Sequence, residues 1–272
     1  MNLAIIGGGR MGSSLIRGLL SSGLLSGPEI LITSSTAEKA AAAAAALGTG
    51  HADSNPEAAS RSEVIVLSVK PGKALEVTAG MAGKLEGKLL ISMVAGIRSD
   101  DLASAAGGAC RIVRVMPNTA IRLLRGTTAV APHSSATDAD ADLAHRLFGA
   151  VGKVETVTEP LLDTVTAVSG SGPAFALLMI EAMAAAGVEG GLESAQSTRF
   201  AAGALAAAAD LVRETGENPS ALRDEITSPG GTTAAGLRVL TDGGSDASGL
   251  GSLVRKAVAA AAARSRELSA PR

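Results

Sequence analysis

The sequence predicts an α/β fold, in which a parallel sheet covered by helices is followed by an all-α part. Three observations support this prediction. Up to about residue 158, short β-branched runs alternate with helical stretches, a glycine-rich loop joins the first run to the first helix, and from residue 159 on only helical stretches occur. At about 150 residues per domain, 272 residues fit two modest domains. We expect these domains at residues 1–158 and 159–272.

The first domain owes its predicted sheet to continuous apolar runs. Such runs, separated by helices, are typical of parallel strands buried on both faces. The expected strands are residues 3–6, 30–33, 64–69, 89–94, 112–116, 128–131 and a final short one at 153–157. Residues 12–22 have helical spacing, and residues 38–47 are rich in alanine, which has the best helix propensity. In the second domain the expected helices are residues 173–186, 194–215, 219–226, 232–240 and 252–268.

The composition excludes several classes of protein. With 46% hydrophobic and 18% charged residues, the chain is not of the disordered class. Its formal net charge is -2, it has no dense basic cluster, and only three Phe and no Trp or Tyr could stack on bases, so we expect no nucleic-acid partner. A single cysteine, Cys110, and three well-separated histidines argue against a disulfide or a metal site.

The apolar content does not predict a membrane protein, because much of it is alanine and no run of 18 residues is uniformly apolar. The first residues enter a glycine turn without a basic segment, unlike a signal peptide. We therefore expect a soluble, cytoplasmic protein with no membrane partner.

The glycine loop carries the first functional signal. Gly7, Gly9 and Gly12 form Gly-x-Gly-x-x-Gly between a strand and a helix, around Arg10 and Met11. In a dinucleotide site the first glycine permits the tight turn, the second lets the pyrophosphate approach, and the third lets helix and strand pack closely. The N–H groups of the helix start attract the phosphates. A plain glycine turn is the alternative, but the context favours a Rossmann-type NAD(P)-binding domain.

The end of the second expected strand indicates which dinucleotide binds. An NAD site usually has an acidic residue here for the ribose hydroxyl. This chain has Ser34 and Ser35 and no acid before Glu38, which favours the 2′-phosphate of NADPH, with NADH still possible. Arg10 could reach this phosphate. The alternative role of Ser35 or Thr36 is to cap the next helix.

Further strand ends should face the same ligand, because ligands of open α/β sheets bind beyond the carboxyl ends of the strands. Lys70 closes an apolar strand, where it could touch the cofactor or be a solvated loop lysine. Asn118 could bind a carboxamide or sugar, or be a turn residue. Cys110, without a histidine neighbour, is interpreted as structural.

Two glycine-rich segments stand out in the second domain. Residues 169–173 read Ser-Gly-Ser-Gly-Pro before a long apolar helix, and residues 227–237 contain a Ser-Pro-Gly-Gly turn that runs into Thr232 and Thr233. Free N–H groups at such a helix start suit a carboxylate. An ordinary capped helix start would explain the same residues.

These motifs together resemble the pyrroline-5-carboxylate reductases. The similarity spans nearly the whole chain: the glycine loop, residues 68–71, 95–97, 116–119 and 169–173, Glu181, residues 227–237 and the closing residues 261–268. The Ser-Pro-Gly-Gly-Thr-Thr segment is its most specific part.

The resemblance implies a Rossmann domain followed by an all-α dimerisation and substrate domain, in a homodimer or larger homo-oligomer. It implies that NADPH or NADH reduces the C=N bond of 1-pyrroline-5-carboxylate to L-proline, the last step of proline biosynthesis. Gly230, Gly231, Thr232 and Thr233 would hold the substrate carboxylate, with Thr233 as the catalytic hydroxyl near the ring nitrogen. Ser34, Ser35 and Asn55 would lie by the adenosine. The nicotinamide half would be lined by Val69, Lys70, Pro71, Ala95, Gly96 and Asn118.

The chain departs from the family pattern at three places: Ala120 replaces a proline, Phe175 a tyrosine, and Gly203-Ala204 a Gln-Thr pair. The last change keeps open a paralogue that reduces a different cyclic imine. A non-enzymatic NADP-binding protein is the alternative from another class. A hydroxyacid dehydrogenase is disfavoured, because residues 173–187 lack the lysine that such enzymes carry there.

Overall fold

The computed structural model describes residues 1–108, 110–241 and 249–269 of the chain. The chain forms two compact units. The first comprises Met1–Gly170 together with the last residues from Ala261 on, and the second comprises Ser171–Ala260. The predicted division at residues 158 and 159 stays a prediction, and the contacts of the first unit continue to Gly170.

A single sheet forms the centre of the first unit, and in the described chain it has eight strands in the order β3-β2-β1-β4-β5-β6-β7-β8. The order reverses beside β1, as in doubly wound folds that bind dinucleotides. The strands are β1 (Leu3–Ile6), β2 (Ile30–Thr33), β3 (Gly50–His51), β4 (Val64–Leu67), β5 (Leu89–Ser92), β6 (Arg111–Pro117), β7 (Gly126–Pro132) and β8 (Gly152–Thr156). Every residue of β1, β2, β4 and β5 is buried, which explains their uninterrupted apolar sequences.

The prediction of an entirely parallel sheet was wrong at one edge. Strand β7 pairs antiparallel with β6, and β8 then pairs parallel with β7. The physical reason is the short connection between Pro117 and Gly126, which holds only the 3₁₀ turn η4 (Thr119–Leu123). A parallel crossover needs a dozen or more residues.

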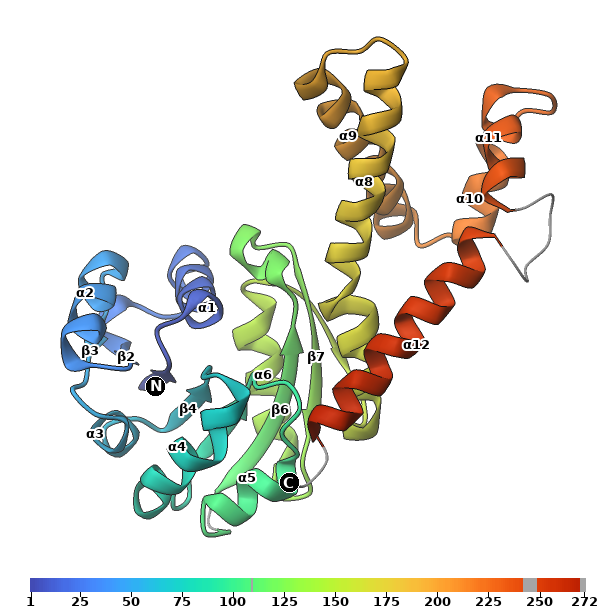
Figure 1. The fold of residues 1–272 in the computed structure, drawn as a ribbon. Helices are drawn as coiled ribbons and strands as arrows, with labels where there is room; N and C mark the ends of the chain where they lie inside the picture. The colour runs from blue at the N-terminus through green and yellow to red at the C-terminus, as the bar shows by residue number, and fades with distance from the viewer. Residues whose placement is uncertain (109, 242–248, 270–272) are drawn as a thin grey trace. The chain divides into compact units, whose positions relative to one another are not determined.

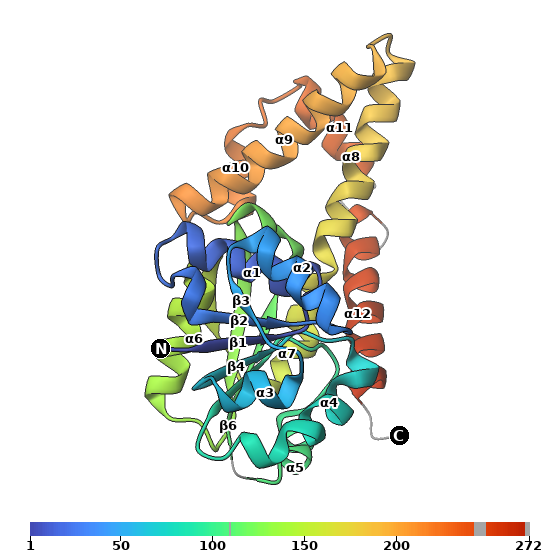
Figure 2. The same cartoon turned by 90° about the vertical axis from the view of Figure 1, so that its left-hand side faces the viewer.

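Helices cover both faces of this sheet (Figures 1 and 2). On one face, α1 (Arg10–Ser21), α2 (Ala37–Leu47) and α6 (Asp138–Gly149) contribute to a core that includes Leu15, Ala44 and Phe148. On the other, α3 (Asn55–Ser60), α4 (Ala74–Met81) and α5 (Ser99–Ala105) bury Ala58, Met81 and Leu102. The remaining 3₁₀ turns are η1 (Gly27–Glu29), η2 (Pro71–Lys73), η3 (Ala82–Lys84) and η5 (Glu159–Leu161).

The chain leaves the sheet through α7 (Leu162–Val165) and a π-helical turn at Thr166–Gly170, both in the first unit. The last turns of α12 (Leu250–Ser269) also belong to this unit. There the hydroxyl of Ser265 donates to the Asp163 carboxylate at 2.5 Å. Residues 261–268, the closing part of the family resemblance, are therefore hydrogen-bonded to α7.

The second unit is helical, as predicted. It contains α8 (Gly172–Glu189), α9 (Ser194–Thr215), α10 (Pro219–Glu225) and α11 (Thr232–Leu240), followed by the first part of α12. Helices α8 and α9 pack against each other near their joined ends (Figures 1 and 2), where the Ser197 hydroxyl donates to the carbonyl of Ala184 at 2.8 Å.

The apolar surface of this unit is largely uncovered in the single chain. No residue of α8 or α11 is buried, and Leu178 and Phe200 are 65% and 61% exposed. In the described residues, one helical stretch, Glu159–Glu189, is long enough and apolar enough to cross a membrane, judged by length and composition only. Its mean hydropathy is 1.5. Burying so much apolar surface requires something outside the single chain.

Candidate functional site

The glycine loop has the geometry of a dinucleotide-binding turn. Gly7 has a φ of +110°, and a side chain there would collide with the Ser68 carbonyl. At Gly12 an added Cβ would lie 2.5 Å from the Gly7 carbonyl oxygen and 2.9 Å from Ile5 Cγ2. At Gly9, by contrast, no atom lies within 4 Å of an added Cβ. The first and third glycines thus serve packing within the protein, whereas the second faces open space that a ligand can enter.

The start of α1 is suited to an anion. Its N-cap residue, Gly9, offers no side-chain cap, and the first turn contains no acidic residue. The first N–H groups of the helix, including those of Arg10 and Met11, therefore lack intrahelical partners. Together with the positive end of the helix dipole they form a phosphate-binding position.

The segment after β2 lies next to this loop, because β2 is the neighbour of β1. Thr36 caps α2 by accepting from the Lys39 N–H at 3.3 Å, so the capping role suggested by the sequence is confirmed for Thr36. Ser34 and Ser35 make no side-chain hydrogen bond to any described residue. Their hydroxyls are therefore available to a ligand.

Asn55 is brought to the same place by a contact that sequence reasoning missed. The hydroxyl of Thr33, a residue only 2% exposed, donates to the Asn55 side-chain oxygen at 2.7 Å. This bond joins the end of β2 to the start of α3. A polar residue closing an otherwise apolar strand was the available signal.

The remaining cofactor-binding candidates lie at the carboxyl ends of the next three strands. Val69 approaches the glycine loop, since its Cγ1 would lie 3.2 Å from a Cβ at Gly7. Lys70 is exposed and precedes the turn that begins at Pro71. Gly96 is buried with a φ of +73°, and Leu268 of α12 would be 3.2 Å from a Cβ there. Glycine is required at this position, next to half-buried Ala95.

Asn118 follows β6, and its amide group is already engaged. Its side-chain oxygen accepts from the backbone N–H groups of Ala120 and Thr127, and its Nδ2 donates to the Ser169 hydroxyl at 3.3 Å. The turn role proposed for Asn118 is therefore confirmed. One N–H of its amide remains for a ligand.

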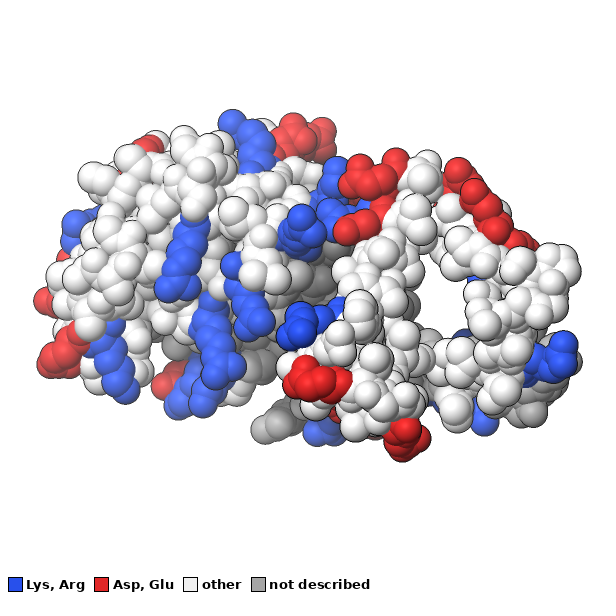
Figure 3. All heavy atoms as spheres, turned by 90° about the horizontal axis from the view of Figure 1, so that it is seen from above, with Lys and Arg blue, Asp and Glu red and all other residues white. Residues whose placement is uncertain are grey.

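All predicted cofactor-binding positions thus converge on one sheet edge. The strands β2, β1, β4, β5 and β6 are consecutive in the sheet, and each has predicted residues directly after its carboxyl end. This is the edge at which open α/β sheets bind ligands. Figure 3 shows, in addition, that Lys and Arg side chains gather on one face of this unit, although the formal net charge is -2.

The predicted substrate-binding residues lie in the second unit, at the start of α11. Gly230 has a φ of +70°, and the Gly231 N–H donates to the Ser228 carbonyl at 3.0 Å, which closes the turn. Gly231 is the N-cap and supplies no side-chain cap. Thr232 and Thr233 are exposed and make no side-chain hydrogen bond to described residues. The helix start is therefore uncapped, unlike the ordinary capped start considered as the alternative.

Cys110 and possible metal ligands were the remaining candidates from the sequence. Cys110 is 5% exposed, and burial raises the pKa of its thiol, which makes it unreactive. In the described part of the chain, no three His, Cys, Asp or Glu side chains are grouped for metal binding.

Comparison with known proteins identifies the family. The chain is 38% identical to the pyrroline-5-carboxylate reductase of Escherichia coli, over 89% of this chain and 90% of that one. The chain belongs to the pyrroline-5-carboxylate reductase family. The family model for the pyrroline-5-carboxylate reductase dimerisation domain matches residues 159–268, and a model described as NADP oxidoreductase, coenzyme F420-dependent, matches residues 2–96.

Solved structures of this family superpose on the whole chain. A pyrroline-5-carboxylate reductase from Coxiella burnetii has a TM-score of 0.91 at 32% identity, covering 99% of both chains. The Plasmodium falciparum enzyme, crystallised with NADP bound, has a TM-score of 0.85 at 28% identity, over 99% of this chain and 98% of that one. The Rossmann-type domain and the helical domain predicted from the sequence are both confirmed.

Proposed function

We propose that this protein reduces the C=N bond of 1-pyrroline-5-carboxylate to L-proline, the last step of proline biosynthesis. The observation that carries the proposal is that the carboxyl ends of five neighbouring strands, including β1 with its glycine loop, lie at one edge of the sheet. The chain also matches pyrroline-5-carboxylate reductases over nearly its full length.

NADPH is the proposed reductant, and the residues present fit it. The uncapped start of α1 with the open position at Gly9 would receive the pyrophosphate, and the free hydroxyls of Ser34 and Ser35 would receive the 2′-phosphate. No acidic residue repels that phosphate between Thr33 and Thr36. When bound, the cofactor supplies a hydride. Lys70, Ala95 and Asn118 are proposed to border its nicotinamide half, together with Val69, Pro71 and Gly96.

The proposed role of the α11 start is to bind and orient the substrate. The N–H groups after Gly231 would accept the carboxylate, and the dipole of α11 would stabilise its charge. Thr233 is the proposed catalytic residue, with its Oγ1 beside the ring nitrogen. Since an imine can arrive already protonated, the site needs no strong acid, and its main contribution is to hold the substrate in position for hydride transfer.

A second copy of this chain is the proposed cover for the exposed apolar faces of α8 and α9. The matching family model is one for dimerisation, and a homodimer or larger assembly would bury side chains such as Leu178 and Phe200. We also propose that the protein is cytoplasmic, because a second copy rather than a membrane would cover these apolar faces. A monomeric mass in light scattering at micromolar concentration would contradict this assembly.

The activity is tested with purified protein, NADPH and racemic pyrroline-5-carboxylate. We expect the NADPH absorbance to fall at a rate proportional to enzyme, with L-proline as the product. If NADPH is consumed only with a different cyclic imine, the chain is a paralogue with another substrate. If NADPH binds but no imine is reduced, the non-enzymatic alternative replaces the proposal.

A further inference from the structure

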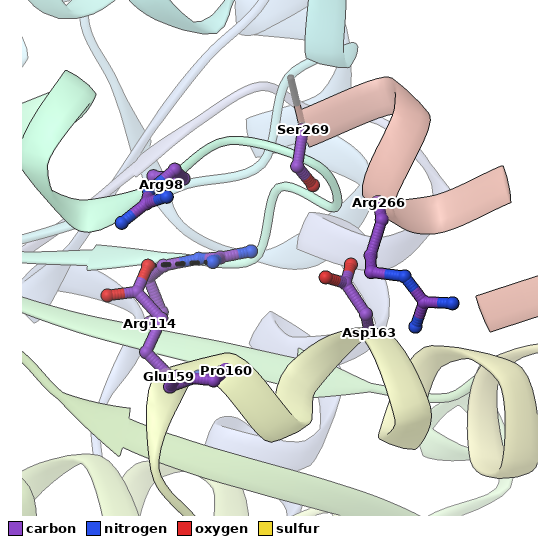
Figure 4. Close-up of a pocket in the computed structure, with 7 residues that line it drawn as sticks. All are labelled: Arg98, Arg114, Glu159, Pro160, Asp163, Arg266 and Ser269. Carbon is purple, nitrogen blue, oxygen red and sulfur yellow. Dashed lines mark hydrogen bonds and ion pairs between the residues drawn. The ribbon is translucent and has the colours of Figure 1, made fainter. Parts of the chain in front are cut away.

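A separate cavity in the first unit lies among α5, β6, α7 and the end of α12 (Figure 4). Its volume is about 420 Å³, within the range of small-molecule sites. It is lined by Arg98, Arg114, Glu159, Pro160, Asp163, Arg266 and Ser269. Apart from Pro160 and Ser269 every lining residue is charged, and the proposed reaction uses none of them.

Arg114 is the central observation. It lies within β6 between the buried residues Val113 and Val115. Its charged side chain is itself only 10% exposed, which is unusual for an arginine. Its Nη1 donates to Glu159 Oε1 at 2.8 Å. Its Nε is enclosed without a hydrogen-bond partner, and Nη2 makes no hydrogen bond to any described residue. Most buried polar atoms have a partner, so a guanidinium with one of five N–H groups engaged calls for another acceptor.

Among the described residues, neither acidic residue of the cavity accepts a hydrogen bond from Nε or Nη2 of Arg114. Glu159 Oε1 already accepts both from Arg114 and from the Ser99 N–H at 2.8 Å. Asp163 accepts from Ser265. Figure 4 shows the Arg114 guanidinium directed away from the Glu159 backbone and into the space toward Asp163 and Ser269. Room for a ligand atom therefore remains beside the terminal nitrogens of Arg114, which face the cavity, whereas Nε is enclosed by protein.

The other two arginines make the cavity electropositive. Arg98 is 3.6 Å from Asp100 and 60% exposed, and Arg266 has no ion-pair partner among the described residues. Among the lining residues, three arginines against Glu159 and Asp163 leave a net charge of one positive unit, and Asp100, which pairs with Arg98, lies outside the lining. Guanidinium groups bind the oxygens of carboxylates and phosphates through two parallel N–H groups.

We propose that this cavity is a binding site for a small oxyanion, a phosphate or carboxylate group, held by Arg98, Arg114 and Arg266. A bound oxyanion would connect the start of α5 to the end of α12. It would thus brace Gly96, which lies two residues before Arg98 and packs against Leu268. The test of this site does not depend on the proposed reaction, because occupancy is measured without cofactor or substrate.

The test is isothermal titration of the protein with inorganic phosphate and, separately, acetate, in buffers matched in ionic strength with sodium chloride. We expect saturable binding of at least one of the two, which also identifies the oxyanion class. Arg266→Gln should weaken it at least tenfold. Arg264→Gln is the matched control, because Arg264 lies on the same helix but pairs with exposed Glu267 at 2.8 Å. This control should bind as wild type does.

Three outcomes would overturn the proposal. One is no binding of either ion. Another is equal weakening by Arg264→Gln and Arg266→Gln, which would indicate a general effect of charge. The third is phosphate binding that survives in Arg266→Gln and is lost in Arg10→Gln, which would place the ion at the glycine loop. Unfolding curves of each variant show that the comparison is made on folded protein.

Discussion

Replacing Gly9 with alanine separates nucleotide binding from folding. The residue has φ and ψ of -75° and -175°, which alanine adopts without strain, and no protein atom would touch the new methyl group. Such a change stabilises the protein by about 0.4–1 kcal/mol through the entropy of the unfolded chain, but alanine is a poorer N-cap than glycine by a similar amount, so we expect the free energy of unfolding to change by less than about 1 kcal/mol. The methyl group nevertheless occupies the space through which a pyrophosphate approaches the α1 N–H groups.

Losing one charge-assisted hydrogen bond costs about 1.5–3 kcal/mol, so Gly9→Ala should raise the Kd for NADPH roughly 10- to 150-fold. The assay is a fluorescence titration with NADPH alongside urea unfolding. Gly80→Ala is the control, because Gly80 is exposed within α4, has open space around its Cβ position and lies outside the predicted site. Gly12→Ala should instead lose about 1–3 kcal/mol of stability through overpacking. Unchanged NADPH affinity in a stable Gly9→Ala protein would refute the role of the loop.

Three further variants test other parts of the molecule. Ser34→Asp should weaken NADPH binding and shift preference to NADH, because it places a carboxylate beside the 2′-phosphate; wild-type protein that prefers NADH tenfold would contradict this. Thr233→Val should lower kcat/KM on pyrroline-5-carboxylate about 10- to 100-fold, or about 1.4–2.7 kcal/mol, without changing NADPH affinity; full retained kcat/KM would leave the Ser-Pro-Gly-Gly turn as a helix start only. Glu159→Gln should lower the free energy of unfolding at neutral pH by about 3 kcal/mol, because it leaves Arg114 without its charged partner, with urea unfolding as the measurement.

The pH dependence of the last variant has a defined sign. Burial alone would raise the pKa of Glu159, but the hydrogen bonds from Arg114 and Ser99 outweigh it and hold that pKa below its usual 4.5. The carboxylate therefore stabilises the fold fully above about pH 4.5, and this contribution is lost as the pH falls through the lower, folded-state pKa. The stability gap between wild type and Glu159→Gln should narrow on acidification, and a constant gap would show that the charge of Glu159 is unimportant.

Local sequence signals predicted the elements that are defined by their own residues. Strands β1 and β2 were placed at their observed bounds because both faces are buried and the runs are uninterrupted. Helix α9 was placed equally well, since it begins after the capping Glu193 and ends at Gly216 in the left-handed conformation. Helix α6, with its polar first turn, and strand β3, with only two residues, were not predicted, because their sequences lack a clear hydrophobic pattern.

Contacts between distant residues could not be predicted in this way. The bond from Thr33 to Asn55 joins residues 22 positions apart, and that from Ser265 to Asp163 joins residues 102 apart. The sequence predicted candidate residues after each strand of the cofactor site, and the strand order of the sheet places these residues at one edge. The arginine cavity had no sequence signal, because Arg98, Arg114 and Arg266 meet only through the return of α12.

The return of α12 to the first unit also sets the order in which the protein can be completed during synthesis. The ribosome makes β1 first, yet the surface that Leu268 covers at Gly96 and the hydroxyl that Asp163 accepts are supplied by the last turns of the chain. The nucleotide-binding unit can therefore begin to fold early but reaches its final packing only after the last turns of α12 have left the ribosome. Cutting the gene at the domain boundary would leave that unit unfinished, and an enzyme engineer who transplants it must carry the terminal helix along.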